Sequence, residues 1–367
     1  MNISNNNAKP KRVLVAISGG VDSSVAAAIL QEQGYEVVGA TMQLWPKALN
    51  EAGEKICCGL DAISSAKRVC DKLGIPHYVF DFREIFKDTV IKDFCLEYKE
   101  GRTPNPCVRC NQIIKFDILL KKALVLGAEF ISTGHYAKTA FDENRKRYLL
   151  KKSPLEKNEQ SYFLHTMTQE QIARTIFPLG DINKGSVREY ARKKELPNSE
   201  RAKSQEICFT GDKDYREFLK EYIGEEIRPG PIVTKDGKRL GSHKGLPFYT
   251  VGQREGMGIS APKPLYVLKI DKANNALIVG KEADLYSSGC IVKDLNIIAL
   301  DRLREGMKFD VKIRYKHVQT PCVIKTAGES ECEIVFENPQ KAVTPGQSAV
   351  FYEGDIVVGG GTIDIIQ

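Results

Sequence analysis

The stretch Val13-Leu14-Val15-Ala16-Ile17-Ser18-Gly19-Gly20-Val21-Asp22-Ser23-Ser24 decides the fold of the first half of this chain. Residues 13–17 form a continuous apolar run, which predicts a buried strand. Residues 21–33 are rich in Ala and end at Gly34, which predicts a helix. A buried strand that passes through a glycine turn into a helix is typical of a parallel sheet covered by helices.

The turn between this strand and this helix predicts a phosphate-binding site. Two glycines let the backbone approach an anion closely, and the helix N-terminus supplies N–H groups and a positive dipole. Ser18, Ser23 and Ser24 add hydroxyl donors, and we assign Asp22 to Mg²⁺ because a bare carboxylate would repel phosphate. The stretch matches neither G-x-x-x-x-G-K-[ST] nor G-x-G-x-x-G, and an ordinary capped turn is the alternative.

Strand and helix signals alternate along the first half, at residues 36–44, 60–73, 78–82, 85–98, 111–126 and 129–133. This alternation predicts an α/β domain in which helices flank a parallel sheet. After about Arg228 short alternating runs are separated by Gly and Pro, and in 307–317 we expect Tyr315 on the core face of a strand. We therefore expect domains at 1–212, at 213–283 (a small central module) and at 284–367 (an antiparallel β-barrel).

Length and composition exclude several classes of protein. The chain has 367 residues, of which 42% are hydrophobic and 28% are charged, so it can form more than one core and is not wholly disordered. No apolar run approaches the ~20 residues of a membrane helix, and the start MNISNNNAKPKR has no secretion signal, so we expect a cytoplasmic protein. The net charge of +7 permits an acidic partner without requiring one.

The ten cysteines predict reactive thiols rather than a disulfide framework. Cys110 lies near the start of a predicted helix, and Arg102 and Arg109 flank it in the sequence. The helix dipole and these cations both favour its thiolate. Cys208 lies in a distant polar loop. If the fold brings the two thiols together, one can carry a persulfide sulfur and the other can attack it.

Two other interpretations of the cysteines stay open. Cys107-x-x-Cys110, joined by Cys208 or by Cys57-Cys58, could hold zinc or an iron–sulfur cluster. The chain lacks the second half of a typical zinc motif, and adjacent cysteines chelate zinc poorly, so we predict no resident metal. The same thiols could also be buried and idle, as we expect for the cysteines in apolar runs, namely Cys70, Cys290, Cys322 and Cys332.

These motifs resemble those of known enzymes. Ser18–Ser24 resembles the loop of enzymes that split ATP between its α and β phosphates, which implies an ATP pyrophosphatase-like, Rossmann-type fold for the first domain. Over nearly its whole length the chain resembles the tRNA-specific 2-thiouridylases. The segments that carry this resemblance are Ser18–Ser24, Gly101–Asn111, Thr133–Tyr136, Gln160–Leu164, Ser204–Phe209, Tyr249–Arg254 and Arg314-Tyr315.

The resemblance implies a role for each matched residue. The nucleophile is Cys110, and the persulfide carrier is Cys208. ATP contacts are implied for Ala16, Ile17, Ser18, Gly19, Gly20, Val21, Asp22, Ser23, Met42 and Gly134. The target base is implied to contact Asn105, Pro106 and Cys107, and tRNA to contact Asn158, Glu159, Gln160, Arg314 and Tyr315. The family usually has Asp at position 107, which favours the cluster alternative here, and Lys-Asp-Gln at positions 158–160.

The resemblance implies ATP-dependent transfer of sulfur to the wobble uridine of tRNA. AMP is placed on the C2 oxygen, and sulfur from the Cys208 persulfide displaces it, which leaves a Cys110–Cys208 disulfide. Implied cofactors are ATP and Mg²⁺, and implied partners are a tRNA anticodon loop and a persulfide-donating relay protein or desulfurase; we expect a monomer that binds no membrane. The alternatives are a synthetase or amidotransferase acting on a small substrate, and a cysteine-rich iron–sulfur RNA-binding protein.

Overall fold

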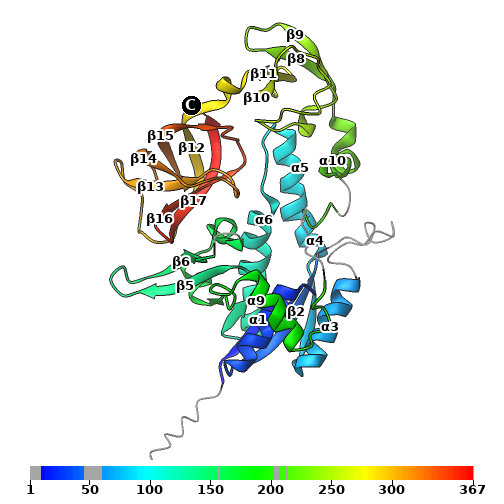
Figure 1. Ribbon diagram of the computed structural model, residues 1–367, viewed down its shortest axis with the longest axis vertical. Coiled ribbons are helices and arrows are strands. Elements are labelled where there is room, and N and C mark those ends of the chain that lie inside the picture. The colour runs from blue at the N-terminus through cyan, green and yellow to red at the C-terminus, as the bar shows by residue number, and fades with distance from the viewer. Residues whose placement is uncertain (1–9, 45–59, 156–157, 202–206, 211–213, 367) are drawn as a thin grey trace, which may run out of the picture.

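The computed structural model describes residues 10–44, 60–155, 158–201, 207–210 and 214–366. A parallel sheet with its helices is followed by a small β module and then by an antiparallel barrel (Figure 1). This architecture confirms the predicted fold class. Among the helices of these residues, none combines the length and the apolar character needed to cross a membrane.

The parallel sheet has the strand order β3-β2-β1-β4-β7, so the strand quoted above lies at its centre. The bounds are β1 (Arg12–Ala16), β2 (Glu36–Gln43), β3 (His77–Asp81), β4 (Phe130–Ser132) and β7 (Thr175–Ile176). Val13 and Val15 pack on the side of α1 (Val21–Glu32) and α3 (Leu60–Leu73). Leu14 and Ala16 point to the opposite side, so both faces of β1 are buried and its run is apolar throughout.

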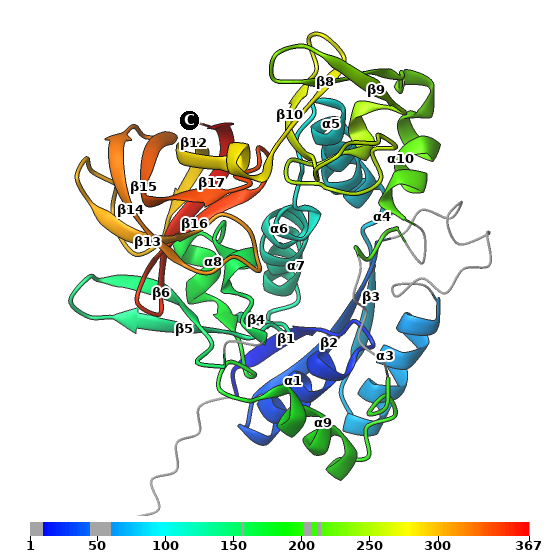
Figure 2. The same cartoon turned by 45° about the horizontal axis from the view of Figure 1, so that its top comes forward.

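Two long helical runs, each with a π-helical segment, pack on the second side of the sheet and extend from it toward the central module and the barrel (Figure 2). Their bounds are α4 (Arg83–Phe86), η1 (Lys87–Ile91) and α5 (Lys92–Lys99), then α6 (Pro106–Arg109), η2 (Cys110–Ile118) and α7 (Leu119–Val125). The second run starts five residues before the predicted 111, because Pro106 suits the first helical position and Asn105 caps the Val108 N–H at 3.4 Å. A π-helix bonds residue i to residue i+5 and has a wider turn than an α-helix, so side chains five residues apart lie closer to one face than they do in an α-helix.

The remaining elements link this domain to the barrel. The hairpin of β5 (Ala137–Asp142) and β6 (Arg147–Lys152) pairs through β6 with the last strand of the barrel. Short helices and α9 complete the domain: η4 (Ser161–Leu164), α8 (Gln169–Ala173) and α9 (Lys184–Lys193). The central module contains α10 (Tyr215–Ile223), η5 (Gly224–Glu226), β8 (Gly230–Thr234), β9 (Arg239–His243), η6 (Leu246–Phe248), β10 (Tyr266–Asp271), β11 (Ala276–Gly280) and η7 (Glu282–Leu285).

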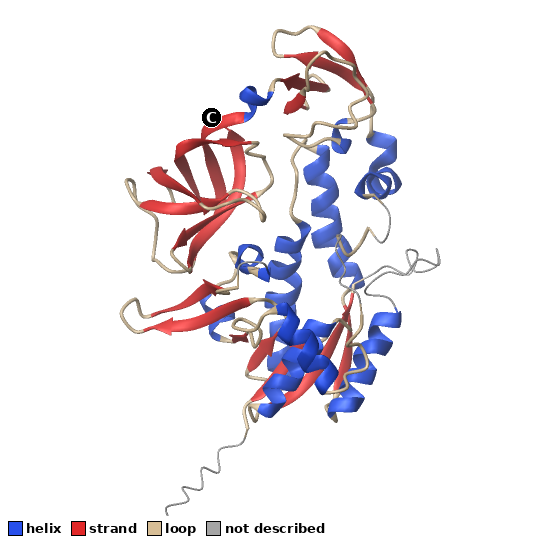
Figure 3. Ribbon diagram, in the orientation of Figure 1, coloured by secondary structure: helices blue, strands red, loops and turns tan. Residues whose placement is uncertain are grey.

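The C-terminal barrel closes because its first and last strands pair (Figure 3). Its strands are β12 (Tyr286–Ile297), β13 (Lys308–Lys312), β14 (Thr320–Ala327), β15 (Glu331–Lys341), β16 (Ser348–Glu353) and β17 (Ile356–Ile366). The predicted strand over 307–317 was too long, since β13 pairs with its neighbours only as far as Lys312. Tyr315 therefore lies in the following turn and not on the core face of a strand.

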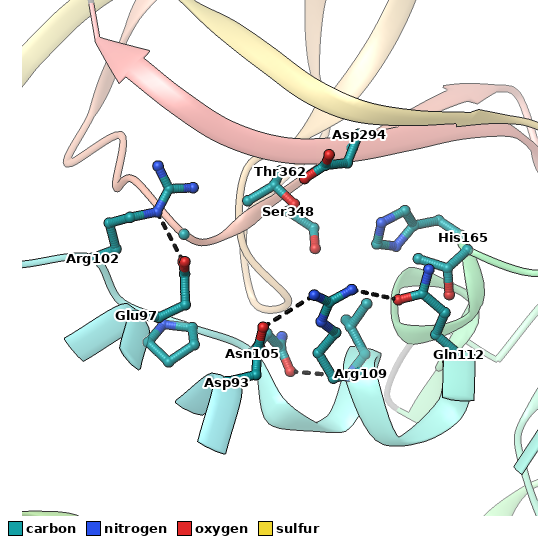
Figure 4. Close-up of a pocket in the computed structure, with 15 residues that line it drawn as sticks. Asp93, Glu97, Arg102, Asn105, Arg109, Gln112, His165, Asp294, Ser348 and Thr362 are labelled. Atoms are coloured by element: carbon teal, nitrogen blue, oxygen red, sulfur yellow. Dashed lines mark hydrogen bonds and ion pairs between the residues drawn. The ribbon is translucent and has the colours of Figure 1, made fainter. Parts of the chain in front are cut away.

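The barrel holds the loop that precedes α6. Arg102 donates to Glu97 at 2.8 Å and pairs with Asp364 of β17, which also pairs with Lys293 at 2.6 Å. The Thr103 N–H donates to the Pro345 carbonyl at 2.8 Å. These contacts border a small interdomain cavity of about 110 Å³, where Figure 4 shows Arg102 beside Glu97. The start of the α6 run is thus fixed by the barrel as well as by its own domain.

Gly346 makes this approach possible. Its φ is +89°, and a Cβ at this position would lie 2.8 Å from the Thr103 nitrogen and 2.9 Å from its carbonyl oxygen. Gln347 donates to the same Thr103 carbonyl at 2.8 Å. The backbones of the two domains can therefore pass this closely only where one of them has no side chain.

We expect Arg102→Met to lower the free energy of unfolding by about 1–3 kcal/mol, because it leaves two carboxylates without their shared cation. The side chains of Arg102 and Asp364 are only 23% and 19% exposed, so water replaces the lost contact poorly. Urea unfolding measures the change. The matched control is Lys121→Met, which breaks an exposed pair with Asp117 and should cost about 0.5 kcal/mol or less. Equal losses in the two variants would contradict the assignment of a structural role to Arg102.

Candidate active site

A cavity of about 500 Å³ opens at the carboxyl end of the parallel sheet, and we call it the cysteine cavity. Open α/β sheets bind their ligands at this edge. The predicted site residues that line it are Ile17, Ser18, Gly20, Val21, Asp22, Met42, Pro106, Cys107, Cys110, Gln160, Cys208 and Tyr315. The fold therefore brings together, in one cavity, residues from nearly all the motifs that the sequence singled out.

The predicted site residues outside this lining fall into two groups. Ala16, Gly19, Ser23 and Gly134 lie behind the lining and shape the turn after β1. A Cβ at Gly134 would lie 2.7 Å from the Ser23 nitrogen, so the loop after β4 packs directly on the start of α1. The second group lies outside the cysteine cavity. Asn105 lines the small interdomain cavity and Glu159 lines a second, larger cavity, while Asn158 and Arg314 make hydrogen bonds within the protein.

The turn after β1 is held by hydrogen bonds from outside the motif. Gly19 has a φ of +76°, and a Cβ there would lie 2.6 Å from the Ala62 carbonyl oxygen. Its carbonyl accepts hydrogen bonds from Asn198 at 2.8 Å and from Ser65 at 3.2 Å. Within the motif, Ser23 donates to the Gly20 carbonyl at 3.1 Å. The backbone of the turn is thus pre-organised at the N-terminus of α1, as a phosphate site requires.

Asp22 is already paired in the structure. One of its carboxylate oxygens accepts a hydrogen bond from the Tyr136 hydroxyl at 2.9 Å, and the other pairs with the Lys184 ammonium. Burial is the main cause that raises the pKa of Tyr136, and the Asp22 carboxylate adds to it, so this hydroxyl stays a donor. Asp22 is the acidic group among the described residues that line the cavity.

Basic side chains that the sequence analysis did not select dominate the charge of the cysteine cavity. They are Lys115 on η2, Lys184 and Arg188 one turn apart on α9, and Arg201. With Asp22 as the acid among the described lining residues, the cavity is strongly positive and suits a polyphosphate. The available signal was the i, i+4 spacing of Lys184 and Arg188 in the sequence, which is also typical of the solvated face of a helix.

The three cysteines of the cavity differ in exposure. Cys110 is buried, with 7% of its surface exposed, Cys208 is half-buried and Cys107 is exposed. Each is present as a thiol. Ser204, Gln205 and Glu206, which precede Cys208 in its motif, lie outside the described residues, and so do Cys57 and Cys58.

The two arginines expected beside Cys110 line the interdomain cavity instead. Arg109 donates to Asp93 and to Gln112, each at 3.0 Å, as Figure 4 shows, and Arg102 pairs with the carboxylates described above. The cation that η2 contributes to the cysteine cavity is Lys115. It lies five residues after Cys110, and the π-helical geometry brings that spacing onto one face.

A zinc ion or an iron–sulfur cluster needs several ligands that surround one position. Within the ranges that the structure describes, no group of three or more His, Cys, Asp or Glu side chains is arranged to hold a metal ion. Cys107, Cys110 and Cys208 share the cavity without forming such a group.

His135 follows β4 and lines the cavity between two aromatic rings. Its Nδ1 lies 2.7 Å from the Thr133 hydroxyl, and the Phe116 and Phe177 rings lie 6.0 Å and 6.2 Å from its own. Burial lowers the pKa of His135 well below its ordinary value, and the Lys115 charge adds to the effect. The imidazole is therefore neutral at neutral pH and presents a hydrogen-bonding group without charge.

A second, larger cavity of about 880 Å³ borders the first, and we call it the lysine groove. It runs between the β5–β6 hairpin and the turn after β13, and its cations are Lys138, Lys152, Lys312 and Lys316. Tyr315 lines both cavities; its hydroxyl donates to the Glu159 carbonyl at 3.0 Å and its ring lies 4.5 Å from that of Phe163.

Of the other residues expected to contact tRNA, Glu159 is buried and the rest are half-buried, and each makes a hydrogen bond within the protein. Glu159 is buried, and its side chain accepts from the Ser161 N–H. Arg314 donates to the Lys341 carbonyl at 3.1 Å, and the Asn158 N–H donates to the Leu155 carbonyl at 3.2 Å. Gln160 reaches the cysteine cavity, while its amide oxygen accepts from the Tyr136 N–H at 3.0 Å.

Three family models match the chain in succession. Residues 11–212 match the tRNA methyl transferase HUP domain, residues 216–281 match the tRNA methyl transferase PRC-barrel domain, and residues 287–363 match the aminomethyltransferase beta-barrel domain. The first of these models covers more than half of the chain.

Curated relatives match over almost the full length. The tRNA-specific 2-thiouridylase MnmA of Acetivibrio thermocellus is 50% identical over 355 residues, which cover 96% of this chain and 99% of the relative. The enzyme of the same name from Carboxydothermus hydrogenoformans is 48% identical over 356 residues, which cover 96% of this chain and 98% of the relative.

Among solved structures, the U34-tRNA thiolase NcsA from Methanococcus maripaludis with its 4Fe-4S cluster is a distant match. It is 19% identical with a TM-score of 0.35, and the match covers 59% of this chain and 67% of that one. At this score the likeness carries no argument about function.

We expect His135 to remain neutral in the folded protein as the pH falls through its ordinary pKa of about 6.5, because burial lowers its folded-state pKa. Because its folded-state pKa is depressed, the unfolded chain takes up this proton first as the pH falls through about 6.5, and His135 then opposes folding. Proton NMR of the imidazole measures the titration, and His135→Gln assigns the resonance. A titration midpoint at or above about 6.5 in the folded protein would contradict this prediction.

Proposed function

The chain belongs to the tRNA-specific 2-thiouridylase family, and from that premise we propose how its residues transfer sulfur to tRNA. The protein is an enzyme of 2-thiouridine synthesis that uses ATP, as its first domain and its relatives indicate. The observation that carries the residue assignments is the cysteine cavity, which holds the phosphate-type turn, two separated thiols and a set of cations.

We assign the phosphates of ATP to the turn after β1 and the cations of α9. The N–H groups at the start of α1 and the hydroxyls of Ser18 and Ser23 favour phosphate oxygens. Lys184, Arg188 and Arg201 supply charge for the pyrophosphate that leaves when the α phosphate is attacked. Met42 and Leu44 give the cavity an apolar side that suits the adenine base.

Asp22 fits a role in holding Mg²⁺. Mg²⁺ is usually bound by one or two carboxylates together with substrate phosphates, and Asp22 is a carboxylate at the turn assigned to the phosphates. When bound, the ion neutralises charge on the leaving pyrophosphate. Lys184 holds Asp22 in place before the nucleotide arrives, because it pairs with one of its oxygens.

The uracil C2 oxygen attacks the α phosphorus of ATP, and pyrophosphate leaves, so the oxygen becomes part of a good leaving group. The terminal sulfur of the Cys208 persulfide then attacks C2 and displaces AMP. The Cys110 thiolate attacks the Cys208 sulfur, the S–S bond to the transferred sulfur breaks, and 2-thiouridine is released. Each sulfur atom that is transferred to uridine is reduced by two electrons and leaves one Cys110–Cys208 disulfide. If Cys110 attacks first, hydrosulfide is the group that displaces AMP, and the balance is the same.

The tRNA reaches the cavity along the lysine groove. Lys138, Lys152, Lys312 and Lys316 suit the phosphates of an anticodon stem and loop, whose unstacked bases are the easiest to splay out. Tyr315 stands where the groove meets the cysteine cavity, so the target base passes this ring on its way to Cys107 and Cys110. The persulfide sulfur comes from a relay protein or desulfurase. We also propose that the domain boundaries lie at residues 212 and 283, and that the enzyme is a cytoplasmic monomer.

We expect Cys110→Ser and Cys208→Ser each to abolish 2-thiouridine formation while ATP binding stays within about twofold, because a hydroxyl replaces sulfur chemistry without changing the charge of the cavity. Mass spectrometry of nucleosides from tRNA incubated with enzyme, ATP and a persulfide donor measures the product. The control is Cys95→Ala, which removes a buried thiol outside the cavity and should keep the product. Product formed by either serine variant would reject the assigned roles.

We expect Arg188→Met to raise the dissociation constant of ATP by about tenfold, since a charge-assisted contact to phosphate is lost. Calorimetric titration with ATP measures it. Lys193→Met removes an exposed cation of the same helix outside the cavity and should leave the constant unchanged. Equal constants for the Arg188 and Lys193 variants would overturn the placement of the phosphates.

A further inference from the structure

A third thiol shares the cysteine cavity with the two that the proposed mechanism uses. Cys107 lies three residues before Cys110 on the same helical run, and both side chains line the cavity together with Cys208. Side chains three residues apart on a helix are neighbours, with Cβ atoms about 5–6 Å apart. Small adjustments at this spacing bring two sulfurs within bonding distance, as in other C-x-x-C motifs.

The three cysteines differ in exposure, and this difference affects how the enzyme can be reduced between turnovers. A Cys110–Cys208 disulfide forms in each cycle of the proposed mechanism and must be reduced before the next one. Cys110 is only 7% exposed and Cys208 is half-buried, so an external thiol meets little of either sulfur. Cys107 is exposed. The other cysteines that the structure describes are all buried outside the cavity; they are Cys70, Cys95, Cys290, Cys322 and Cys332.

We propose that Cys107 is a resolving thiol that moves the disulfide from the buried Cys110–Cys208 pair to an accessible Cys107–Cys110 pair. This inference rests on the proposed function, because it begins from the disulfide that sulfur transfer leaves behind. It gives Cys107 a role in the turnover of the enzyme in addition to its proposed place beside the target base.

The exchange balances without a further reagent until its last step. The Cys107 thiolate attacks the Cys110 sulfur, the Cys107–Cys110 bond forms, the Cys110–Cys208 bond breaks, and Cys208 leaves as a thiolate that takes up the proton lost by Cys107. An external dithiol reductant then supplies two electrons and two protons and becomes oxidised itself. Cys208 is meanwhile a thiol again and can accept the next sulfur.

The charges around Cys107 bear on its thiolate. Loss of hydration among the groups that surround it raises the pKa of Cys107, and the Lys115 charge opposes this rise. The neutral His135 adds no charge beside Lys115. Lys184, Arg188 and Arg201 add positive charge to the same cavity, and Asp22 is already paired with Lys184.

The test compares the first turnover with later ones, in the full-length enzyme with tRNA, ATP, a persulfide donor and a small dithiol reductant. We expect Cys107→Ser and Cys107→Asp each to form about one 2-thiouridine per enzyme and then to slow at least tenfold relative to the variant's own first turnover. Cys107→Asp restores the residue that the family usually carries, so it separates the loss of a resolving thiol from a disturbed helix start. Cys95→Ala serves as the control and should turn over normally.

Disulfide mapping after one turnover gives the second readout. The reaction is stopped with acid and alkylated, and the peptides are identified by mass spectrometry. We expect a Cys107–Cys110 disulfide with alkylated Cys208 in the wild type, and a Cys110–Cys208 disulfide in both Cys107 variants. A wild-type enzyme with Cys110–Cys208 and alkylated Cys107 would overturn the inference, as would unchanged later turnovers in both variants.

The same experiment keeps this inference apart from the proposed function. If Cys110→Ser still forms product in the first turnover, the assignment of the nucleophile fails before Cys107 is considered. If Cys110→Ser is inactive but the Cys107 variants turn over like the wild type, only the resolving role fails. Iron that copurifies with activity and is lost in Cys107→Ser would also overturn this role, because the thiol would then be a cluster ligand.

Discussion

Burial of β1 on both of its faces is the constraint on which the rest of the structure depends. Because Val13 and Val15 face one helical layer while Leu14 and Ala16 face the other, the strand can occupy only the middle of the sheet. The turn after it then opens at the carboxyl edge, between the ends of β2 and β4. Every group that the chemistry needs is positioned relative to that turn, either by packing on the sheet or by a hydrogen bond to the turn itself.

The cavity and the groove divide the work of recognition by their chemistry. The cysteine cavity is enclosed by the sheet, two helical runs and the short segment around Cys208, and it combines apolar and basic walls. The lysine groove is wider and lies between the hairpin and the barrel. In the function that we propose, tRNA lies along the second while one of its bases enters the first, and Tyr315 lines both.

The sequence predicted the parts of this arrangement that are local and failed for those that depend on tertiary contacts. An apolar run followed by Ser18–Asp22 is enough to predict strand, turn and helix, because burial and backbone freedom act over neighbouring residues. The cations Lys184 and Arg188 were missed, since only the packing of α9 against α1 brings them to the cavity. Lys115 was missed because an α-helical projection separates it from Cys110, whereas the π-helical run aligns them. The arginines next to Cys110 in the sequence were misassigned, because carboxylates on other elements hold them.

The close approach of Gly346 to Thr103 limits how modular this architecture can be. Barrel and nucleotide-binding domain appear as separate units in a ribbon drawing, yet a backbone contact with no room for a methyl group joins them next to the helix that bears the reactive thiols. A barrel from another protein that is fused to this sheet domain would lack the close backbone contact between Gly346 and Thr103. A barrel exchanged between distant relatives would therefore need the matching loop at residues 101–105 as well. The segment that must be exchanged as a unit thus includes residues of both domains.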